Sequence, residues 1–159
     1  MRQIFILVTL ITLSLQAFAR TEYPSRPDGR LTPGELCHTP DTYRYPERIA
    51  YCERDVSTDQ KDQIFESYRR LGYRLNPAHR SSYKIDHYIP LCAGGSNDNE
   101  NLWPQHRSVY ILTDTLEKLA CERLAMGVIS QREVVSLIMT AKNDHSKIES
   151  VRREISNRR

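Results

Sequence analysis

The segment 82–105 constrains the fold of this chain more than any other part of the sequence. Residues 82–91 mix β-branched and aromatic types, and they predict a short strand that ends or bends near Pro90. The glycine-containing stretch 94–100 predicts a tight loop, and residues 101–103 predict a second extended segment. A helix is expected after this segment, ending at Gly127. The order strand, loop, strand and helix predicts an α+β fold.

Apolar spacing predicts the helices. Ser57 and Gln60 form a candidate capping box for a helix that ends at Gly72, and Ser130 with Glu133 forms another at the start of a last helix. The three apolar sides expected to be buried are Ile64, Phe65, Tyr68 and Leu71 in the first helix; Ile111, Leu112, Leu116, Leu119, Ala120 and Leu124 in the second; and Val134, Leu137, Ile138 and Ala141 in the last.

The first 19 residues have the pattern of a secretory signal peptide. Arg2 precedes an uncharged apolar run over 4–15, and Ala17-Phe18-Ala19 fits a cleavage site after Ala19. A membrane anchor is the alternative, but this run is shorter than the roughly 20 apolar residues that cross a bilayer. We therefore expect a secreted or periplasmic protein with no membrane span in the mature chain.

The mature chain is expected to contain an arm over 20–56 and one domain over 57–159 with a basic C-terminal tail. Five prolines and two glycines lie between residues 20 and 54, a density that predicts a loop-rich arm. Tyr43, Tyr45 and Tyr51 in this arm either pack it onto the domain or contact nucleic-acid bases, and packing is favoured.

Four cysteines follow the signal segment, so export predicts two disulfides. A zinc site is the alternative, but no two cysteines have the spacing of a structural zinc knuckle. Three connectivities are possible. We favour Cys37–Cys52 with Cys92–Cys121, since the second bridge would join the end of the first strand of segment 82–105 to the following helix.

Three residues of segment 82–105 have side chains suited to hydrolytic chemistry. The carboxylate of Asp86 suits a hard divalent cation, and the imidazole of His87 titrates near neutrality and can accept a proton from water. Asn101 arrives from across the loop and is expected to hold His87 and the loop in place.

The pattern Asp-His-Tyr-Ile-Pro-Leu, Gly-Gly-Ser-Asn and Asn-Leu-Trp-Pro-Gln, over 86–105, resembles the HNH endonuclease family in its small exported bacterial branch. A weaker resemblance continues through Asp114, Leu116 and Glu117 to Gly127, with Thr113 where that branch usually has lysine. The resemblance implies a ββα-metal core with flanking helices. It also implies largely nonspecific hydrolysis of DNA, with RNA as a second candidate substrate.

The same resemblance assigns roles. His87 would be the general base, Asp86 would ligate a single Mg²⁺ or similar ion, and Asn101 would orient the histidine. The family usually supplies a second ligand from the following helix, but residues 109–112 here are Val-Tyr-Ile-Leu, none a good ligand. The nearby substitutes are His106, Asp114 and Glu117.

The net charge of +3 is too small to identify nucleic acid as a partner. Arg80, Lys84 and Arg107 flank the motif and are expected to contact backbone phosphates, whereas the basic residues of 152–159 are more simply a solvated surface. Two other functions stay open: a nucleic-acid-binding protein of the same fold without catalysis, and an exported, disulfide-stabilised protein-interaction domain in which the motif holds a structural zinc or calcium ion.

Overall fold

The computed structural model describes residues 23–158. The predicted signal peptide at 1–19 lies outside these residues. Within 23–158, no helix combines the length and the apolar character needed to cross a bilayer.

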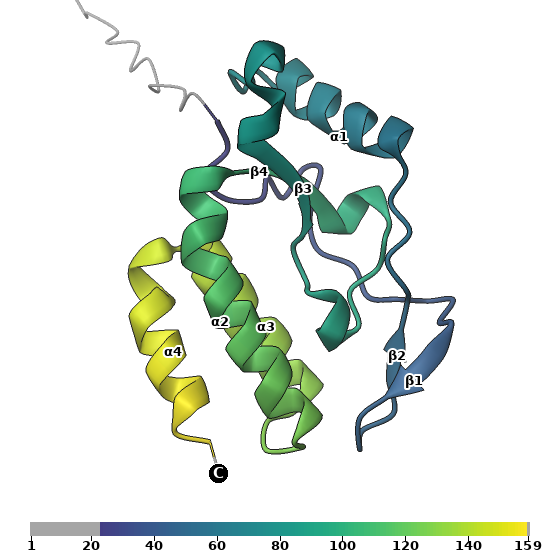
Figure 1. Ribbon diagram of the computed structural model, residues 1–159, viewed down its shortest axis with the longest axis vertical. Helices are drawn as coiled ribbons and strands as arrows, with labels where there is room; N and C mark the ends of the chain where they lie inside the picture. The colour runs from purple at the N-terminus through teal and green to yellow at the C-terminus, as the bar shows by residue number, and fades with distance from the viewer. Residues whose placement is uncertain (1–22, 159) are drawn as a thin grey trace, which may run out of the picture.

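A two-stranded antiparallel ribbon lies between one helix on one side and three on the other (Figure 1). Strand β3 (Tyr83–His87) pairs with β4 (Leu102–His106), and Asp86 lies opposite Trp103. Helix α2 (Arg107–Ala125) follows β4 without a linker, and α1 (Thr58–Arg70) packs on the opposite side of the ribbon. The expected order of strand, loop, strand and helix is therefore present, and the fold is α+β.

The loop between the two strands contains two 3-10 turns, η2 (Leu91–Ala93) and η3 (Asn99–Asn101). The C-terminal half adds α3 (Gln131–Asn143) and α4 (Ile148–Ser156), both packed on α2. The capping box predicted at Ser130 is complete, because its side chain and that of Glu133 each accept a backbone hydrogen bond from the other residue's N–H. The capping box predicted at Ser57 is only half formed. The Ser57 hydroxyl accepts from the N–H of Gln60, but the Gln60 side chain donates to the carbonyl of Asn97 in the loop instead of returning to Ser57.

Two hydrophobic clusters meet at the loop. One joins α1 to the ribbon through buried residues that include Phe65, Tyr68, Ile85 and Trp103, and it includes Tyr88 from the start of the loop. The other joins the three C-terminal helices through Leu116, Leu124, Val134, Ile138, Val151 and Ile155, and it includes Ile89 and Ala93 from the loop. The loop is thus packed on both sides.

Two expectations about the helices were wrong. Ile111 and Leu112 are 60% and 44% exposed, since the buried side of α2 runs through Val109, Thr113 and Leu116, at a spacing that turns residues 111 and 112 away from the core. The helix that begins after Ser130 is also not the last one, because α4 follows it and buries Val151 and Ile155.

The N-terminal arm is loop-rich, as predicted, but it contains a hairpin of β1 (Thr42–Arg44) and β2 (Ile49–Tyr51) that the sequence did not indicate. Its tyrosines behave differently from one another. Tyr45 packs against the helical cluster, Tyr43 is exposed, and Tyr51 lies 3.3 Å below the guanidinium of Arg44.

Both expected disulfides are formed. Cys37–Cys52 closes the base of the β1–β2 hairpin, and Cys92–Cys121 joins η2 to α2. The described residues include no free cysteine.

Candidate active site

His87 is the last residue of β3 and its side chain is almost fully buried. Its Nε2 lies 3.0 Å from Oδ1 of Asn97, and the amide of Asn97 donates from Nδ2 to the carbonyl of Glu53 at 2.6 Å. Because the Glu53 carbonyl can only accept, the Asn97 oxygen must face the ring, and Nε2 must carry the proton. The lone pair of His87 therefore lies on Nδ1, which no described residue engages in a hydrogen bond.

The imidazole is neutral at neutral pH. Burial lowers the pKa of His87 to about 4, against the opposing effects of the Asn97 hydrogen bond and the Asp86 carboxylate. A neutral ring held by one nitrogen, with a lone pair on the other, can accept a proton from a water molecule.

Asn101 was expected to hold both His87 and the loop, but it holds only the loop. Its fully buried amide accepts from the N–H of Ile89 at 2.8 Å and donates to the carbonyls of Ile89 and Ser96 at 3.0 Å each. It makes no hydrogen bond to the imidazole, which Asn97 orients in its place. Asn101 thus fixes the backbone just after the Asp-His pair.

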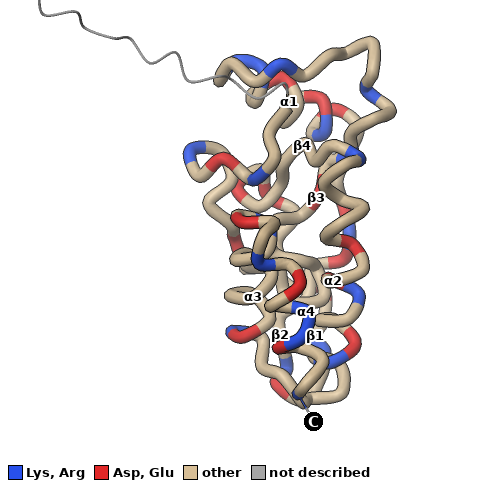
Figure 2. The backbone as a smooth tube through the Cα atoms, turned by 90° about the vertical axis from the view of Figure 1, so that its left-hand side faces the viewer, with Lys and Arg blue, Asp and Glu red and all other residues tan. Residues whose placement is uncertain are grey.

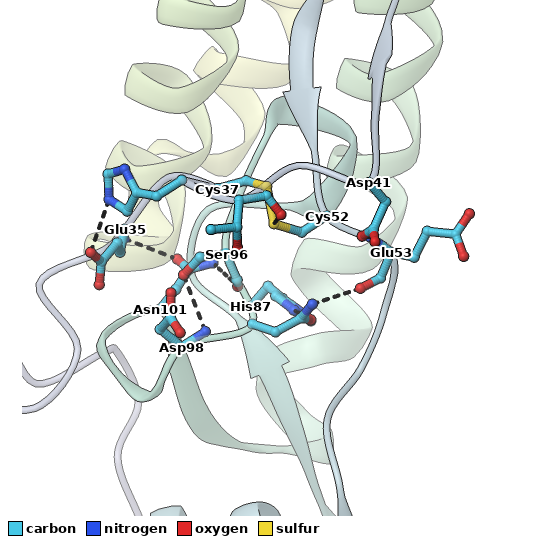
Figure 3. Close-up of a disulfide and its surroundings, with 12 residues drawn as sticks. Glu35, Cys37, Asp41, Cys52, Glu53, His87, Ser96, Asp98 and Asn101 are labelled. Atoms are coloured by element: carbon cyan, nitrogen blue, oxygen red, sulfur yellow. Dashed lines mark hydrogen bonds and ion pairs between the residues drawn. A yellow bond between two sulfur atoms is a disulfide. The ribbon is translucent and has the colours of Figure 1, made fainter.

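The N-terminal arm forms backbone hydrogen bonds with the same loop. Leu36 forms an isolated bridge with Gly95, and the carbonyl of Glu35 accepts from Ser96 N–H at 3.0 Å. Figure 3 shows His87, Glu53 and the Cys37–Cys52 disulfide gathered around this loop. Arm residues on both sides of the disulfide, at 35–37 and at 53, therefore contact the loop that orients His87.

Asp86, Asp114 and Glu117 form an acidic group that could hold a metal ion. One oxygen from each lies within 4.8 Å of the others. Asp86 comes from β3, while Asp114 and Glu117 lie one turn apart on α2. A set made only of carboxylate oxygens suits a hard cation such as Mg²⁺, Mn²⁺ or Ca²⁺.

Two lysines share this acidic group. The ammonium of Lys142, from the last turn of α3, lies 3.4 Å from Asp86 Oδ2 and 2.9 Å from Glu117 Oε1. Lys84 lies 2.6 Å from Asp114 and 3.5 Å from Asp86. The three carboxylates are therefore already partly neutralised by the chain itself.

Burial and these lysines set the protonation of the group. Burial raises the pKa of Asp86, but Lys142 and Lys84 outweigh it, so the net pKa is lowered. Burial also raises the pKa of Glu117 to about 7, because the attraction of Lys142 does not fully offset it. Lys142 keeps its charge, since Glu117 and Asp86 outweigh burial and raise its pKa.

His106, an expected substitute ligand, lies outside the acidic group. It caps the N-terminus of α2, where its Nδ1 accepts from the N–H of Ser108, and its ring stacks on Tyr23 at 4.1 Å. In the ribbon it pairs with Tyr83, three residues from Asp86, or about 10 Å along the strand. Of the three predicted substitutes, the fold brings only Asp114 and Glu117 to Asp86.

The three predicted phosphate-binding residues are in different environments. Lys84 is paired with carboxylates, as above. Arg80 donates to the carbonyl of Tyr83 and lies over the ring of Phe65. Arg107 is exposed at the start of α2 and forms no ion pair with a described residue. Basic and acidic residues are interspersed along the backbone in Figure 2.

Asn97 and Lys142 were not among the predicted site residues. Asn97 is the last residue of the Gly-Gly-Ser-Asn turn, so its place in the motif could have identified it as a site residue. The sequence indicates Lys142 less clearly. It lies four residues after Ile138 and eight after Val134, on the apolar side of α3. A lysine on that side has to be paired within the protein.

Comparisons of the chain with protein-family models, with curated protein sequences and with solved structures found no match. The geometry of the site therefore has to support a function by itself.

Proposed function

We propose that this protein is an exported, metal-dependent endonuclease of the HNH type that hydrolyses phosphodiester bonds in DNA with little sequence preference. The observation that carries the proposal is the fixed tautomer of His87. A buried, neutral histidine with its lone pair on Nδ1 lies next in sequence to a carboxylate of the Asp86–Asp114–Glu117 group. The Asp86 carboxylate also lies near enough to the ring to raise the pKa of His87 against the effect of burial. A base near a cation-binding group is what hydrolysis of a phosphodiester needs.

In this proposal His87 is the general base, and its Nδ1 accepts a proton from the water that attacks phosphorus. Asn97 is a positioning residue, because it keeps the proton on Nε2 and the ring in one orientation. Asn101 is also a positioning residue, since it fixes the backbone at Ile89.

Asp86 would hold the divalent ion together with Asp114 or Glu117. All are oxygen ligands, which fits Mg²⁺. When bound, such an ion stabilises negative charge on the phosphoryl group and on the leaving oxygen. The ammonium groups of Lys142 and Lys84 contact the same carboxylates, so at least one of the two lysine side chains has to move when an ion binds.

The architecture supports the same proposal. The HNH resemblance implies two antiparallel strands and a following helix, with the Asp-His pair at the end of the first strand, and β3, β4 and α2 have this arrangement. The two disulfides are compatible with an extracellular or periplasmic protein.

The test is cleavage of supercoiled plasmid, of a single-stranded DNA oligonucleotide and of an RNA oligonucleotide by the oxidised mature protein, with Mg²⁺ and with EDTA. The variants are His87→Ala and, as a matched control, His79→Ala, which removes an exposed histidine in a 3-10 turn before β3. We expect cleavage that requires both Mg²⁺ and His87 and that survives loss of His79. Equal cleavage by the wild type and His87→Ala would refute the proposal.

The second candidate is a nucleic-acid-binding protein of the same fold without catalysis. The pairing of the acidic group with Lys142 and Lys84 favours it, because the two lysines partly neutralise the three carboxylates without a metal. This candidate predicts salt-dependent retention of DNA by the wild type and no cleavage with any divalent ion.

A further inference from the structure

Lys142 is the least expected residue of the site. Its side chain is fully buried, and its ammonium donates to the carbonyl of His87 at 2.5 Å. It also pairs with Asp86 on β3 and with Glu117 on α2. One charged group from α3 thus connects the strand and the helix that supply the acidic group.

An ammonium in this position competes with a metal ion for the same oxygens. Divalent ions lie about 2.0–2.6 Å from their carboxylate ligands. The Lys142 nitrogen lies 2.9 Å from Glu117 and 3.4 Å from Asp86, so it occupies the space that an ion bound to both would need. The two positive charges would also repel strongly in this buried setting.

The alternative explanation is that Lys142 only ties the elements together. In that case any group that donates to the His87 carbonyl would replace it. The contacts of Lys142 with Asp86 and Glu117 indicate a role in charge balance as well, because these are two of the three residues able to hold a metal ion. A buried ammonium with two acidic partners fixes the charge of the group as well as its position.

We propose that Lys142 is a built-in counter-ion, and that a divalent cation binds Asp86 and Glu117 only by displacing its ammonium. This inference rests on the metal site of the proposed function but not on hydrolysis. Without a metal, Lys142 holds the two carboxylates in position. Cation binding by the wild-type protein is therefore weak, and removal of the lysine charge strengthens it.

The test compares the wild type with Lys142→Met, which keeps an apolar chain of similar length and removes the charge. Ile138→Ala is the matched control, since Ile138 is buried one turn earlier on α3, belongs to the helical hydrophobic cluster and carries no charge. The melting temperature is measured in EDTA and in Mg²⁺, Mn²⁺ or Ca²⁺, and the Kd of each ion is measured by calorimetry.

We expect little effect of the ions on the wild type. Lys142→Met should melt lower in EDTA and recover by about 5–10 °C at an ion concentration about 100 times Kd. Ile138→Ala should melt lower than the wild type in every condition without recovery. Asp86→Asn in the Lys142→Met background should abolish the recovery, because it removes a ligand.

Equal cation affinity in the wild type and Lys142→Met, whether tight or absent, would overturn the inference. If Lys142→Met does not fold, Lys142→Gln replaces it, and tight Mg²⁺ binding by the wild type would by itself be the overturning result. Failure of the proposed function looks different. If Lys142→Met gains cation affinity but neither protein cleaves DNA, the counter-ion role stands and the nuclease does not.

Discussion

The Cys37–Cys52 disulfide should support the orientation of His87 as well as the stability of the fold. Cys52 is followed directly by Glu53, whose carbonyl accepts from Asn97, and Asn97 fixes the histidine ring. We therefore predict that Cys37→Ala/Cys52→Ala loses activity beyond what its loss of stability explains. The matched control is Cys92→Ala/Cys121→Ala, since that bridge makes no such connection to Asn97.

Loop entropy gives the expected stability losses. The bridges span 15 and 29 residues, so removing them should lower the free energy of unfolding by about 3 and about 3.6 kcal/mol respectively. The control variant thus loses at least as much stability. Loss of an orienting hydrogen bond behind a catalytic group typically lowers activity about 10–100-fold, and only the Cys37–Cys52 variant should show this.

The assay is kcat for DNA cleavage at a temperature where circular dichroism shows both variants folded, with the His87 pKa measured by NMR. In the Cys37–Cys52 variant this pKa should rise from about 4 toward its ordinary value, since a loosened arm exposes the ring to water. The NMR result tests the connection even in a protein without activity. Equal losses of kcat in the two variants, with an unchanged His87 pKa, would refute the reasoning.

Three further predictions concern the same loop. The pKa of His87 is about 4 when folded and about 6.5 when unfolded, so the unfolded state takes up the proton first as pH falls. Acidification from about 6.5 to about 4 should therefore cost about 3 kcal/mol of stability, measured by urea denaturation, and His87→Gln should lose less over this range. Gly95→Ala should lower the melting temperature strongly, because its Cβ would lie 1.9 Å from the Ile89 carbonyl oxygen. Gly29→Ala, whose Cβ would have nothing within 4 Å, should leave the melting temperature unchanged. Asn101→Ala should cost about 2–5 kcal/mol, because three buried hydrogen bonds are lost and the Ile89 groups are left unpaired; a melting temperature within 2–3 °C of the wild type would contradict this.

The local elements were predictable because their signals are local. The helix caps at Ser57 and Ser130, and the turn around Gly94 and Gly95, follow from short-range patterns. The disulfide pairing was correct as well. The β1–β2 hairpin was missed because its strands have three residues each, too few for an alternating pattern to emerge.

The partners within the site were less predictable because they depend on tertiary contacts. The spacing of Asp86, Asp114 and Glu117 in the sequence could not show that they converge, and His106 was an equally good substitute until the strand register placed it elsewhere. Likewise, the choice between Asn97 and Asn101 as the partner of His87 depends on the path of the arm, because Glu53 fixes the Asn97 amide.

The arm and the domain contribute to one site, although the sequence predicts a boundary between them at residue 56. The arm supplies the carbonyl that fixes Asn97, α3 supplies the ammonium between Asp86 and Glu117, and α2 supplies two of the three carboxylates. A site completed by distant segments can form only after the fold has closed. Cleavage should therefore be lost with the arm, because the Asn97 amide loses its Glu53 partner, even if the ribbon and α2 keep their secondary structure.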